Sequence, residues 1–241
     1  MSIPFNCSKR HQPPGIKLLY EDRDIIVVDK VPGLLTIATD KKQTQTAYYR
    51  LMAYVRKGNA KSKNRIFIVH RLDRDVSGVL IFAKTSEAKK YLQEHWGETE
   101  KKYITVVHGK PEKSEATISS YLTENRARIM YSTHDPQKGK LSHTAYRVLK
   151  GNEEFSLLEI NLLTGRKNQI RAHLAESGHP IVGDKKYGKK RSGHKRLALH
   201  AYFLSLTHPY NKKPLVFETE VPGYFNALLS GNNASREKTH Q

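Results

Sequence analysis

Short apolar runs alternate with amphipathic segments along the chain, and no internal repeat is present. Runs rich in β-branched and aromatic residues are typical of strands. They predict strands at residues 24–30, 65–72, 78–84, 102–110, 142–150 and 154–165. Residues 197–206 fit either a strand or a buried helix. Because several strands follow one another without a helix between them, the pattern favours an α+β fold with a mainly antiparallel sheet over a doubly wound parallel one.

Three segments have the apolar spacing of amphipathic helices. They cover residues 46–57, 85–97 and 166–177. Thr44 or Thr46 is available as the N-cap of the first helix, and Thr85 or Ser86 opens the second. Gly97 is the expected end of the second helix, since glycine readily adopts the conformation that terminates a helix.

The two ends of the chain differ from the part between them. Residues 1–15 are polar and interrupted by proline, which predicts an N-terminal arm, and residues 230–241 predict a flexible tail. Residues 16–229 are expected to form one domain. Cys7 is the single cysteine, which argues against an intrachain disulfide and a multi-cysteine metal site. No segment is apolar enough to span a membrane, so a cytoplasmic protein is expected.

Basic residues outnumber acidic ones, with 42 Lys and Arg against 23 Asp and Glu and a formal net charge of +19. An excess of this size favours a polyanionic partner, most often nucleic acid, over a purely solubilising role that balanced charges would also serve. Seven of the basic residues lie in residues 184–196. This segment predicts either a solvated loop or phosphate contacts made by Lys189, Lys190 and Arg191.

Asp73 is the first candidate for chemistry. It follows the strand predicted at 65–72, where a rigid, half-buried carboxylate suits a nucleophile or base. From its position alone, a turn aspartate bonded to nearby backbone N–H groups is the alternative, and Asp75 fits that alternative better. Arg171, on the helix predicted at 166–177, is either the cation that a partly buried carboxylate needs or a surface residue.

Other sites of known chemistry lack their sequence patterns. The chain contains neither the glycine-rich loop of nucleotide-triphosphate enzymes nor that of dinucleotide-binding folds. His173 and His179 do not have the i, i+4 spacing of a zinc-binding helix. The sequence therefore predicts no metal site.

Four ordered segments resemble the motifs of the RluA-type pseudouridine synthases: HRLDRDVSGVLIFAKT, KKYITVVHGK, TGRKNQIRAHLAESGHPIVGDKKYG and RLALHAYFLSLTHP. The resemblance runs from about residue 16 to about residue 229. It implies isomerisation of a uridine in structured RNA, in which the bond from N1 to C1′ breaks, the base rotates and C5 joins C1′. It also implies the fold of that family, a mainly antiparallel sheet flanked by helices, and no metal or organic cofactor.

The resemblance assigns roles to single residues. Asp73 falls on the essential aspartate, Tyr103 on the tyrosine that packs on the target base, and Arg171 on the basic residue that pairs with the aspartate. Ionised Asp73 either attacks C1′ or acts on a proton, and the sequence leaves the route open. A uridine must leave its stack to be reached, and Tyr103 offers it a ring face. The motif positions expected to give structural support or contact RNA are Arg71, Arg166 and Gln169.

Two positions depart from the family's pattern. Val76 stands where threonine is usual, and Asn168 stands where histidine is usual. Both lie beside the residues assigned to chemistry, so they concern substrate fit more than activity. The catalytic pattern begins near Lys17, which leaves no room for the N-terminal S4 domain common in the family. The resemblance is to short members acting on tRNA or large-subunit rRNA, and a monomer is expected.

Two other classes of protein remain open. A basic RNA-binding or RNA-chaperone protein without catalysis would explain the charge, but it gains nothing from a carboxylate facing RNA. A nucleoside or glycoside hydrolase would use Asp73 and Asp75 together. The two carboxylates are two residues apart in one turn, whereas those of glycosidases usually approach the bond from different elements.

Overall fold

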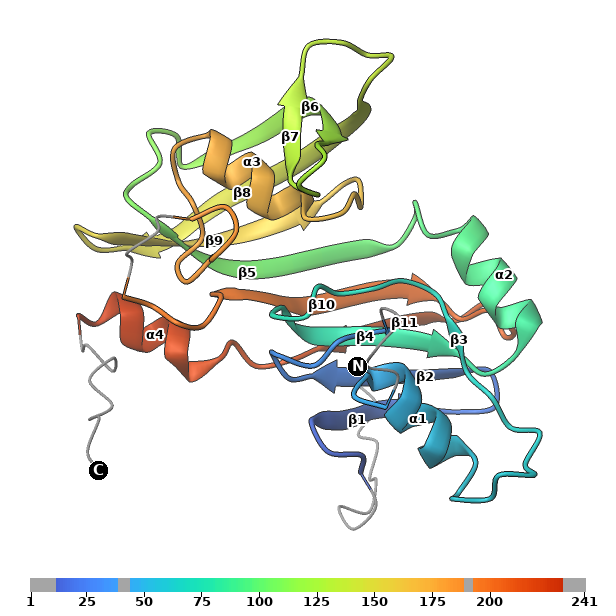
Figure 1. Ribbon diagram of the computed structural model, residues 1–241. Helices are drawn as coiled ribbons and strands as arrows, with labels where there is room; N and C mark the ends of the chain where they lie inside the picture. The colour runs from blue at the N-terminus through green and yellow to red at the C-terminus, as the bar shows by residue number, and fades with distance from the viewer. Residues whose placement is uncertain (1–11, 39–43, 189–192, 232–241) are drawn as a thin grey trace. The chain divides into compact units, whose positions relative to one another are not determined.

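The structure, a computed structural model, describes residues 12–38, 44–188 and 193–231 and divides into two compact units (Figure 1). Unit 1 comprises Met1–Glu100 and Ala201–Thr219, and unit 2 comprises Lys101–His200 and Glu220–Gln241. Both units combine antiparallel strands with helices, which confirms the predicted α+β class. The expected division into an arm, one domain at 16–229 and a tail stays a prediction. Outside the described residues lie most of that arm, most of that tail and the basic residues Lys189, Lys190 and Arg191.

Unit 1 is a sheet in which strands follow the order β1, β2, β4, β10, with β11 added beside β10 and β3 beside β4. The ladders between β1 and β2, β2 and β4, β3 and β4, and β10 and β11 are all antiparallel. The strands are β1 (Ile16–Glu21), β2 (Ile25–Lys30), β3 (Phe67–Ile68), β4 (Ser77–Ala83), β10 (Leu199–Thr207) and β11 (Pro214–Glu218). The helices of this unit are α1 (Ala47–Val55) and α2 (Ser86–Glu94).

One hydrophobic cluster of unit 1 lies on one face of this sheet and under α2. Alternate residues of β2 and β4, among them Ile25, Val27 and Ile81, are fully buried there together with Ala88 and Leu92 of α2. Full burial of each large aliphatic side chain contributes about 1.5–3 kcal/mol. The strands are therefore fixed rigidly where the turn that follows β3 leads into β4.

Threonine caps begin both helices of unit 1. The Thr46 hydroxyl accepts a hydrogen bond from the N–H of Tyr49, and the Thr85 hydroxyl accepts one from Ala88, each at 3.1 Å. Each cap satisfies one of the N–H groups that the first turn leaves without a partner, worth about 1 kcal/mol. Of the expected N-caps, Thr46 and Thr85 are thus confirmed.

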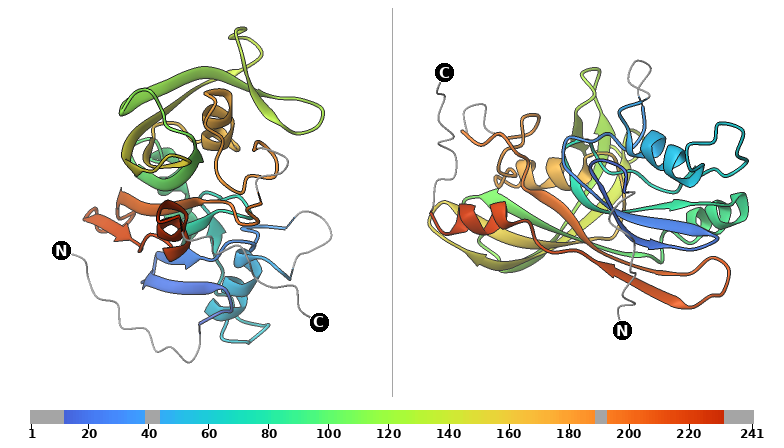
Figure 2. Two further views of the ribbon diagram at one scale, coloured as in Figure 1. Left: turned by 90° about the vertical axis from the view of Figure 1, so that its left-hand side faces the viewer. Right: turned by 90° about the horizontal axis from the view of Figure 1, so that it is seen from below.

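Unit 2 contains antiparallel strands in the order β5, β9, β8, β6, β7. Its strands are β5 (Glu100–His108), β6 (Glu115–Glu124), β7 (Met130–Thr133), β8 (Lys140–Gly151) and β9 (Phe155–Leu162). Its helices are α3 (Gln169–Glu176) and α4 (Gly223–Leu229). Figure 2 shows β6 and β8 curving around α3, which places this helix against the concave face of the unit's own sheet.

Several predicted boundaries are wrong. The strand expected at 65–72 pairs only at Phe67–Ile68, because the following residues are held by side-chain contacts instead of a ladder. The second helix ends at Glu94 and not at Gly97. The third begins at Gln169, three residues late, because Asn168 has a left-handed backbone with φ 49°. Residues 197–206, open between strand and helix, mostly form β10.

The helices in the described part of the chain are too short and too polar to pass through a membrane. The longest of them, α1 and α2, have nine residues each, whereas a spanning helix needs about 20.

Candidate active site

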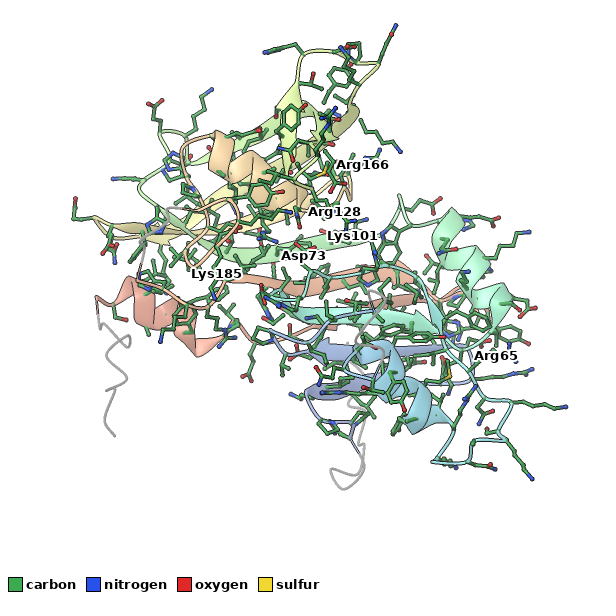
Figure 3. All side chains as sticks on the ribbon, viewed as in Figure 1. Arg65, Asp73, Lys101, Arg128, Arg166 and Lys185 are labelled. Atoms are coloured by element: carbon green, nitrogen blue, oxygen red, sulfur yellow. The ribbon has the colours of Figure 1, made fainter. Side chains whose placement is uncertain are left out.

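Asp73 lies in unit 1 at the start of a tight turn that leads from β3 into β4 (Figure 3). The N–H of Val76 donates to the carbonyl of Asp73 at 3.2 Å and closes the turn. The buried residue Leu72 is fixed by Thr36, whose hydroxyl donates to its carbonyl at 2.7 Å and accepts from its N–H at 3.2 Å. Asp73 is half-buried and the neighbouring Arg71 is exposed. The turn thus presents a carboxylate from a backbone that is tied down on its N-terminal side.

A buried lysine ties down the other side of the turn. Lys30, at the end of β2, has no exposed surface, and its Nζ donates to the carbonyls of Leu34 at 2.9 Å, Val31 at 3.1 Å and Arg74 at 3.2 Å. The N–H of Gly33 donates to the same Arg74 carbonyl at 2.8 Å. Because Arg74 follows Asp73 directly, Lys30 and Gly33 hold the turn against the end of β2.

Burial lowers the pKa of Lys30 to about 8, although Asp75, Asp73 and Asp29 oppose the shift. At neutral pH its ammonium group therefore still carries a positive charge, within the field of the carboxylates of this turn. A buried ammonium is stable only where carbonyls and negative charges surround it. Lys30 is thus a structural and electrostatic support for Asp73.

Replacement of Lys30 by methionine should remove the pH dependence of stability that the lowered pKa of Lys30 causes. The folded pKa lies below the value of 10.5 for an ordinary lysine, so the folded chain releases the proton first and the stability due to this group rises with pH between the two values. From about pH 7.5 to about pH 10, the wild type should gain about 2 kcal/mol over the Lys30→Met variant, at 1.36 kcal/mol for each pKa unit. Urea unfolding at both pH values measures the difference. An equal difference in unfolding free energy between wild type and variant at the two pH values would contradict the lowered pKa of Lys30.

Asp75 and Val76 are the last two residues of the turn, and neither is assigned to the chemistry. Asp75 forms an exposed ion pair with Arg74 at 3.0 Å, which supports its expected role in shaping the turn. Val76 is 3% exposed. Valine has the branched shape of threonine without the hydroxyl, so this departure from the family's pattern fills the same buried position and keeps the backbone bond that closes the turn.

Arg171 lies on α3 in unit 2 and forms a bidentate ion pair. Its Nε donates to one oxygen of Asp184 at 2.7 Å and its Nη2 to the other at 2.8 Å. The Asp184 side chain is fully buried, and that of Arg171 is 11% exposed. Burial would raise the pKa of Asp184, but the hydrogen bonds and charge of Arg171 outweigh it and lower the pKa below its usual value. The guanidinium therefore has a fixed direction.

Asn168 and Tyr187 hold the guanidinium from two further sides. The Asn168 side-chain oxygen accepts from Nη1 of Arg171 at 3.2 Å, and its amide nitrogen donates to the Tyr187 hydroxyl at 3.2 Å. The Arg171 guanidinium lies 5.2 Å from the centre of the Tyr187 ring. Asparagine also tolerates the left-handed backbone found at this position. The departure from histidine at position 168 thus has a structural reason of its own.

Gln169 is buried and positions α3. Its side-chain oxygen accepts from the Thr164 hydroxyl at 2.9 Å and from the N–H of Arg166 at 3.0 Å. Its amide nitrogen donates to the His143 carbonyl at 3.0 Å and to the Thr144 hydroxyl at 2.9 Å. Gln169 is 2% exposed and its polar atoms are occupied within the unit, while its role in structural support or RNA contact stays a prediction. Arg166, by contrast, is exposed in the loop before α3.

His173 fixes the same face of α3 one turn later. Its ring nitrogens lie 3.0 Å from the Ser120 hydroxyl and 2.9 Å from the Thr144 hydroxyl. Burial lowers its pKa, so the ring is neutral at neutral pH. Gln169 and His173, each two positions from Arg171, lie against the sheet. Arg171 therefore lies on a different side of the helix.

Tyr103 lies in β5, opposite Ile160 of β9, with a partly exposed side chain. The expected site residues therefore fall in both units, Asp73 and Arg71 in unit 1, and Tyr103, Arg166 and Arg171 in unit 2. The pairing of Asp73 with Arg171 stays a prediction. The sequence reading missed four supporting residues: Lys30, Thr36, Asp184 and Tyr187. Only Asp184 carried a signal, as the single acidic residue of a basic segment.

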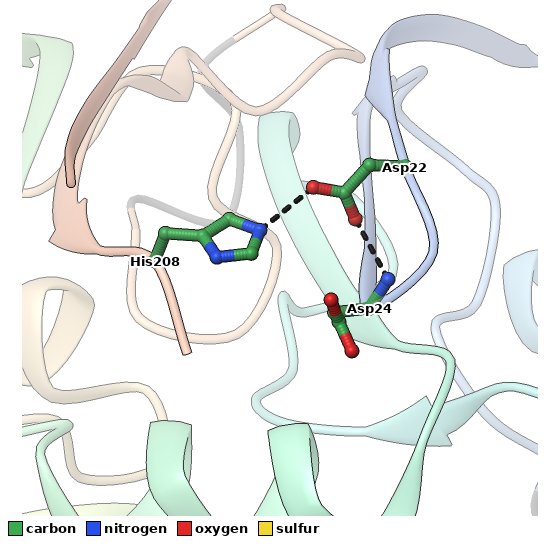
Figure 4. Close-up of side chains that lie close together, drawn as sticks. All are labelled: Asp22, Asp24 and His208. Carbon is green, nitrogen blue, oxygen red and sulfur yellow. Dashed lines mark hydrogen bonds and ion pairs between the residues drawn. The ribbon is translucent and has the colours of Figure 1, made fainter. Parts of the chain in front are cut away.

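A second cluster of polar side chains in unit 1 joins two turns (Figure 4). Asp22, Asp24 and His208 bring potential ligand atoms within 4.8 Å of one another. One oxygen of Asp22 accepts the N–H groups of Asp24 and Ile25 at 2.8 and 2.9 Å, and the other lies 2.7 Å from Nε2 of His208. The Nδ1 atom of His208 accepts backbone N–H groups, so its Nε2 carries the proton and donates. These bonds occupy the ligand atoms of Asp22 and His208, and they join the two turns of unit 1.

The fold resembles those of solved pseudouridylate synthases. Human RNA pseudouridylate synthase domain containing 4 aligns with a TM-score of 0.74 at 22% identity, over 90% of this chain and 93% of that one. Human RNA pseudouridylate synthase domain containing 1 aligns with a TM-score of 0.68 at 24% identity, over 96% of this chain and 90% of that one. The architecture is that of a pseudouridine synthase.

Sequence comparison gives the family. The RNA pseudouridylate synthase family matches residues 24–176. An RNA pseudouridine synthase of Aquifex aeolicus is 34% identical over 89% of this chain and 72% of its own length. Ribosomal large subunit pseudouridine synthase D of Nitrosomonas europaea is 34% identical over 91% of this chain and 66% of its own length.

The chain therefore belongs to the RNA pseudouridylate synthase family. It is an isomerase that acts on RNA and converts uridine to pseudouridine, as its motifs predict.

Proposed function

We propose that Asp73, Tyr103 and Arg171 carry out the isomerisation and that the substrate is large-subunit rRNA. The similarity to ribosomal large subunit pseudouridine synthase D, 34% identity over 91% of this chain, is the observation that carries the choice of RNA. We further propose that the protein acts as a monomer in the cytoplasm, which fits the single cysteine and the high positive charge.

The fixed turn supports the role of Asp73. Isomerisation breaks the bond from N1 to C1′ and forms one from C5 to C1′; the hydrogen on C5 leaves as a proton and N1 takes up a proton, so the formula of the nucleoside is unchanged. An ionised Asp73 either attacks C1′ or takes a proton during these steps. Both roles require a well-positioned carboxylate, and the bonds from Thr36 to Leu72 and from Lys30 to Arg74 support this by fixing the backbone on both sides of Asp73.

The partly exposed ring of Tyr103 supports a contact with the extruded base, worth about 1–3 kcal/mol if the base stacks. The fixed guanidinium of Arg171 supports a role in pairing with a carboxylate or phosphate. Its Nε and Nη2 are engaged by Asp184, and its Nη1 donates to Asn168. Exposed Arg71 and Arg166 are proposed to contact RNA, together with Lys189, Lys190 and Arg191.

The test is incubation of the purified protein with unmodified transcripts of large-subunit rRNA and of tRNA. Pseudouridine is then mapped by carbodiimide adducts that stop primer extension. We expect stops at defined uridines of the rRNA and none in the tRNA. Stops in tRNA alone would show that the substrate is tRNA and not rRNA. Release of free uracil would show that the reaction is hydrolysis and not isomerisation.

A further inference from the structure

Unit 1 contains a basic pocket at the end of β4 that lies away from Asp73. Its volume is about 1090 Å³, and its polar lining includes Glu21, Arg23, Tyr54, Lys57, Arg65 and Lys84. The Asp73 turn precedes β4, and Lys84 follows it. At about 3.3 Å per residue, the seven residues of β4 separate the two ends by roughly 23 Å. Figure 3 shows Arg65 far from Asp73 within this unit. The pocket is thus distinct from the catalytic turn.

The one carboxylate of this pocket is neutralised inside it. Lys84 forms an ion pair with Glu21 at 2.7 Å, with side chains 22% and 19% exposed, and the Tyr54 hydroxyl donates to the other oxygen of Glu21 at 2.9 Å. The lining as a whole has four basic side chains and this one carboxylate, for a net charge of +3. A negatively charged ligand would therefore meet no opposing charge from Glu21.

Three basic side chains of the pocket remain available. Arg23, Lys57 and Arg65 are exposed, and among the residues that the structure describes none of the three has an ion-pair partner. They come from three places in the chain: the turn between β1 and β2, the end of α1 and the start of β3. Basic side chains that only serve solubility can be spread over the surface. Their convergence on one pocket favours the binding of an anionic ligand.

The loop that carries two of these residues has a defined backbone. The side-chain amide of Asn64 donates to the Val55 carbonyl at 3.1 Å, and Nε of Arg56 donates to the Asn64 carbonyl at 3.2 Å. These bonds join the two ends of the loop and hold Lys57 and Arg65 on the same pocket. Lys57 itself has a left-handed backbone with φ 51°, which ends α1, since the N–H groups of Lys57 and Gly58 donate to the carbonyls of Tyr54 and Ala53.

We infer that this pocket binds the phosphodiester backbone of the RNA that flanks the target uridine. The inference rests on RNA as the substrate of the enzyme. The chemistry required is that of successive phosphates, since three cations spread around an open pocket match a polyanion better than a single small anion. At roughly 23 Å along β4 from the catalytic turn, the pocket contacts neighbouring nucleotides and does not touch the reacting base.

The test replaces the three available cations with glutamine in one variant, Arg23→Gln with Lys57→Gln and Arg65→Gln. Lys90, Lys113 and Lys213 are exposed lysines outside the pocket, and their replacement by glutamine is the matched control for net charge. The probe is a fluorescent transcript of the rRNA segment around a uridine that the wild type modifies. Affinity is measured by anisotropy from low to high salt, and kcat and KM are measured on the same RNA.

The pocket variant should bind this RNA roughly 60- to 125-fold more weakly at about 0.15 M salt, because each of the three lost phosphate contacts costs about four- to fivefold and reduces the salt slope by about 0.8. Its KM should rise while kcat stays within about twofold, since the reacting base is untouched. The control variant should lose less than about threefold. On a transcript too short to extend from the target uridine to the pocket, wild type and pocket variant should bind equally.

Equal losses in the pocket and control variants would overturn the inference, because they would show a general charge effect. An unchanged KM on the long transcript would overturn it too. If ATP or inorganic phosphate bound to the wild type but not to the pocket variant, and RNA affinity were the same in both, the ligand of the pocket would be a small phosphate compound and not RNA. If the wild type modified no RNA at all, the proposed function would fail first, so the two failures are distinguishable.

Discussion

The Asp73→Asn variant should lose at least about 10³-fold in the rate of pseudouridine formation, because an amide is neither a nucleophile nor a base at neutral pH. The turn should keep its shape, since Leu72 and Arg74 are held through their backbone atoms. The rate is measured under single-turnover conditions with RNA that carries tritium at C5 of uridine, which is released when C5 bonds to C1′. Affinity for RNA and the melting temperature should stay close to those of the wild type.

Asp75→Asn is the matched control for this change. It makes the same chemical substitution two residues later in the same turn, where the carboxylate pairs with exposed Arg74. An exposed pair of this kind contributes about 0–1 kcal/mol, so activity should stay within a few-fold of the wild type. Equal losses in both variants would show that the negative charge of the turn matters and not the carboxylate of Asp73 itself.

The Asp184→Asn variant should be less stable by about 3–5 kcal/mol. It leaves the Arg171 guanidinium, 11% exposed, without the negative charge that compensates its burial. The rate constant should fall by about 10²-fold as Arg171 loses its direction. Since the folded pKa of Asp184 is lowered, its stabilising contribution is present above the usual pKa of an aspartate and is lost as the pH falls through the folded value. Urea unfolding at neutral and acidic pH measures the loss of stability and its pH dependence. Single-turnover kinetics measure the rate constant.

Asp135→Asn serves as the control within unit 2. Asp135 pairs at 3.0 Å with Lys138, whose side chain is 78% exposed, and loss of such an exposed pair should leave the free energy of unfolding close to that of the wild type. If Asp184→Asn unfolded with the same free energy as the wild type, the ion pair with Arg171 would not be the support that its geometry indicates.

The apolar pattern predicted the fully buried strand β4 and the half-exposed β8, and it missed β6 and β11. β4 is buried along its whole length and is obvious as an apolar run. β6 alternates between exposed and partly buried Ser, Thr and Glu positions, which gives no apolar run even though its ladder to β8 is long. β11 is short, and only one of its five residues is buried. Cross-strand pairing, which stabilises such strands, is invisible in local sequence.

Position alone identified Asp73 as a turn aspartate, and the family resemblance supplied the prediction of its chemistry. The contacts that fix it come from Thr36 and Lys30, 36 and 44 residues away from the atoms that they bind. No local pattern reports such partners. Lys30 in particular stands at the end of an apolar strand, where a lysine would be expected to reach solvent, and the structure buries it completely. Long-range hydrogen bonds of this kind depend on the assembled fold.

Pseudouridine maps of large-subunit rRNA from living cells test the central claim most directly. Cells that lack the gene are compared with the same cells carrying the wild type, Asp73→Asn or Asp75→Asn. The wild type and Asp75→Asn should restore pseudouridine at the same defined uridines, and Asp73→Asn, expressed at the same level, should restore none. Full modification of those uridines by the Asp73→Asn protein would contradict the account.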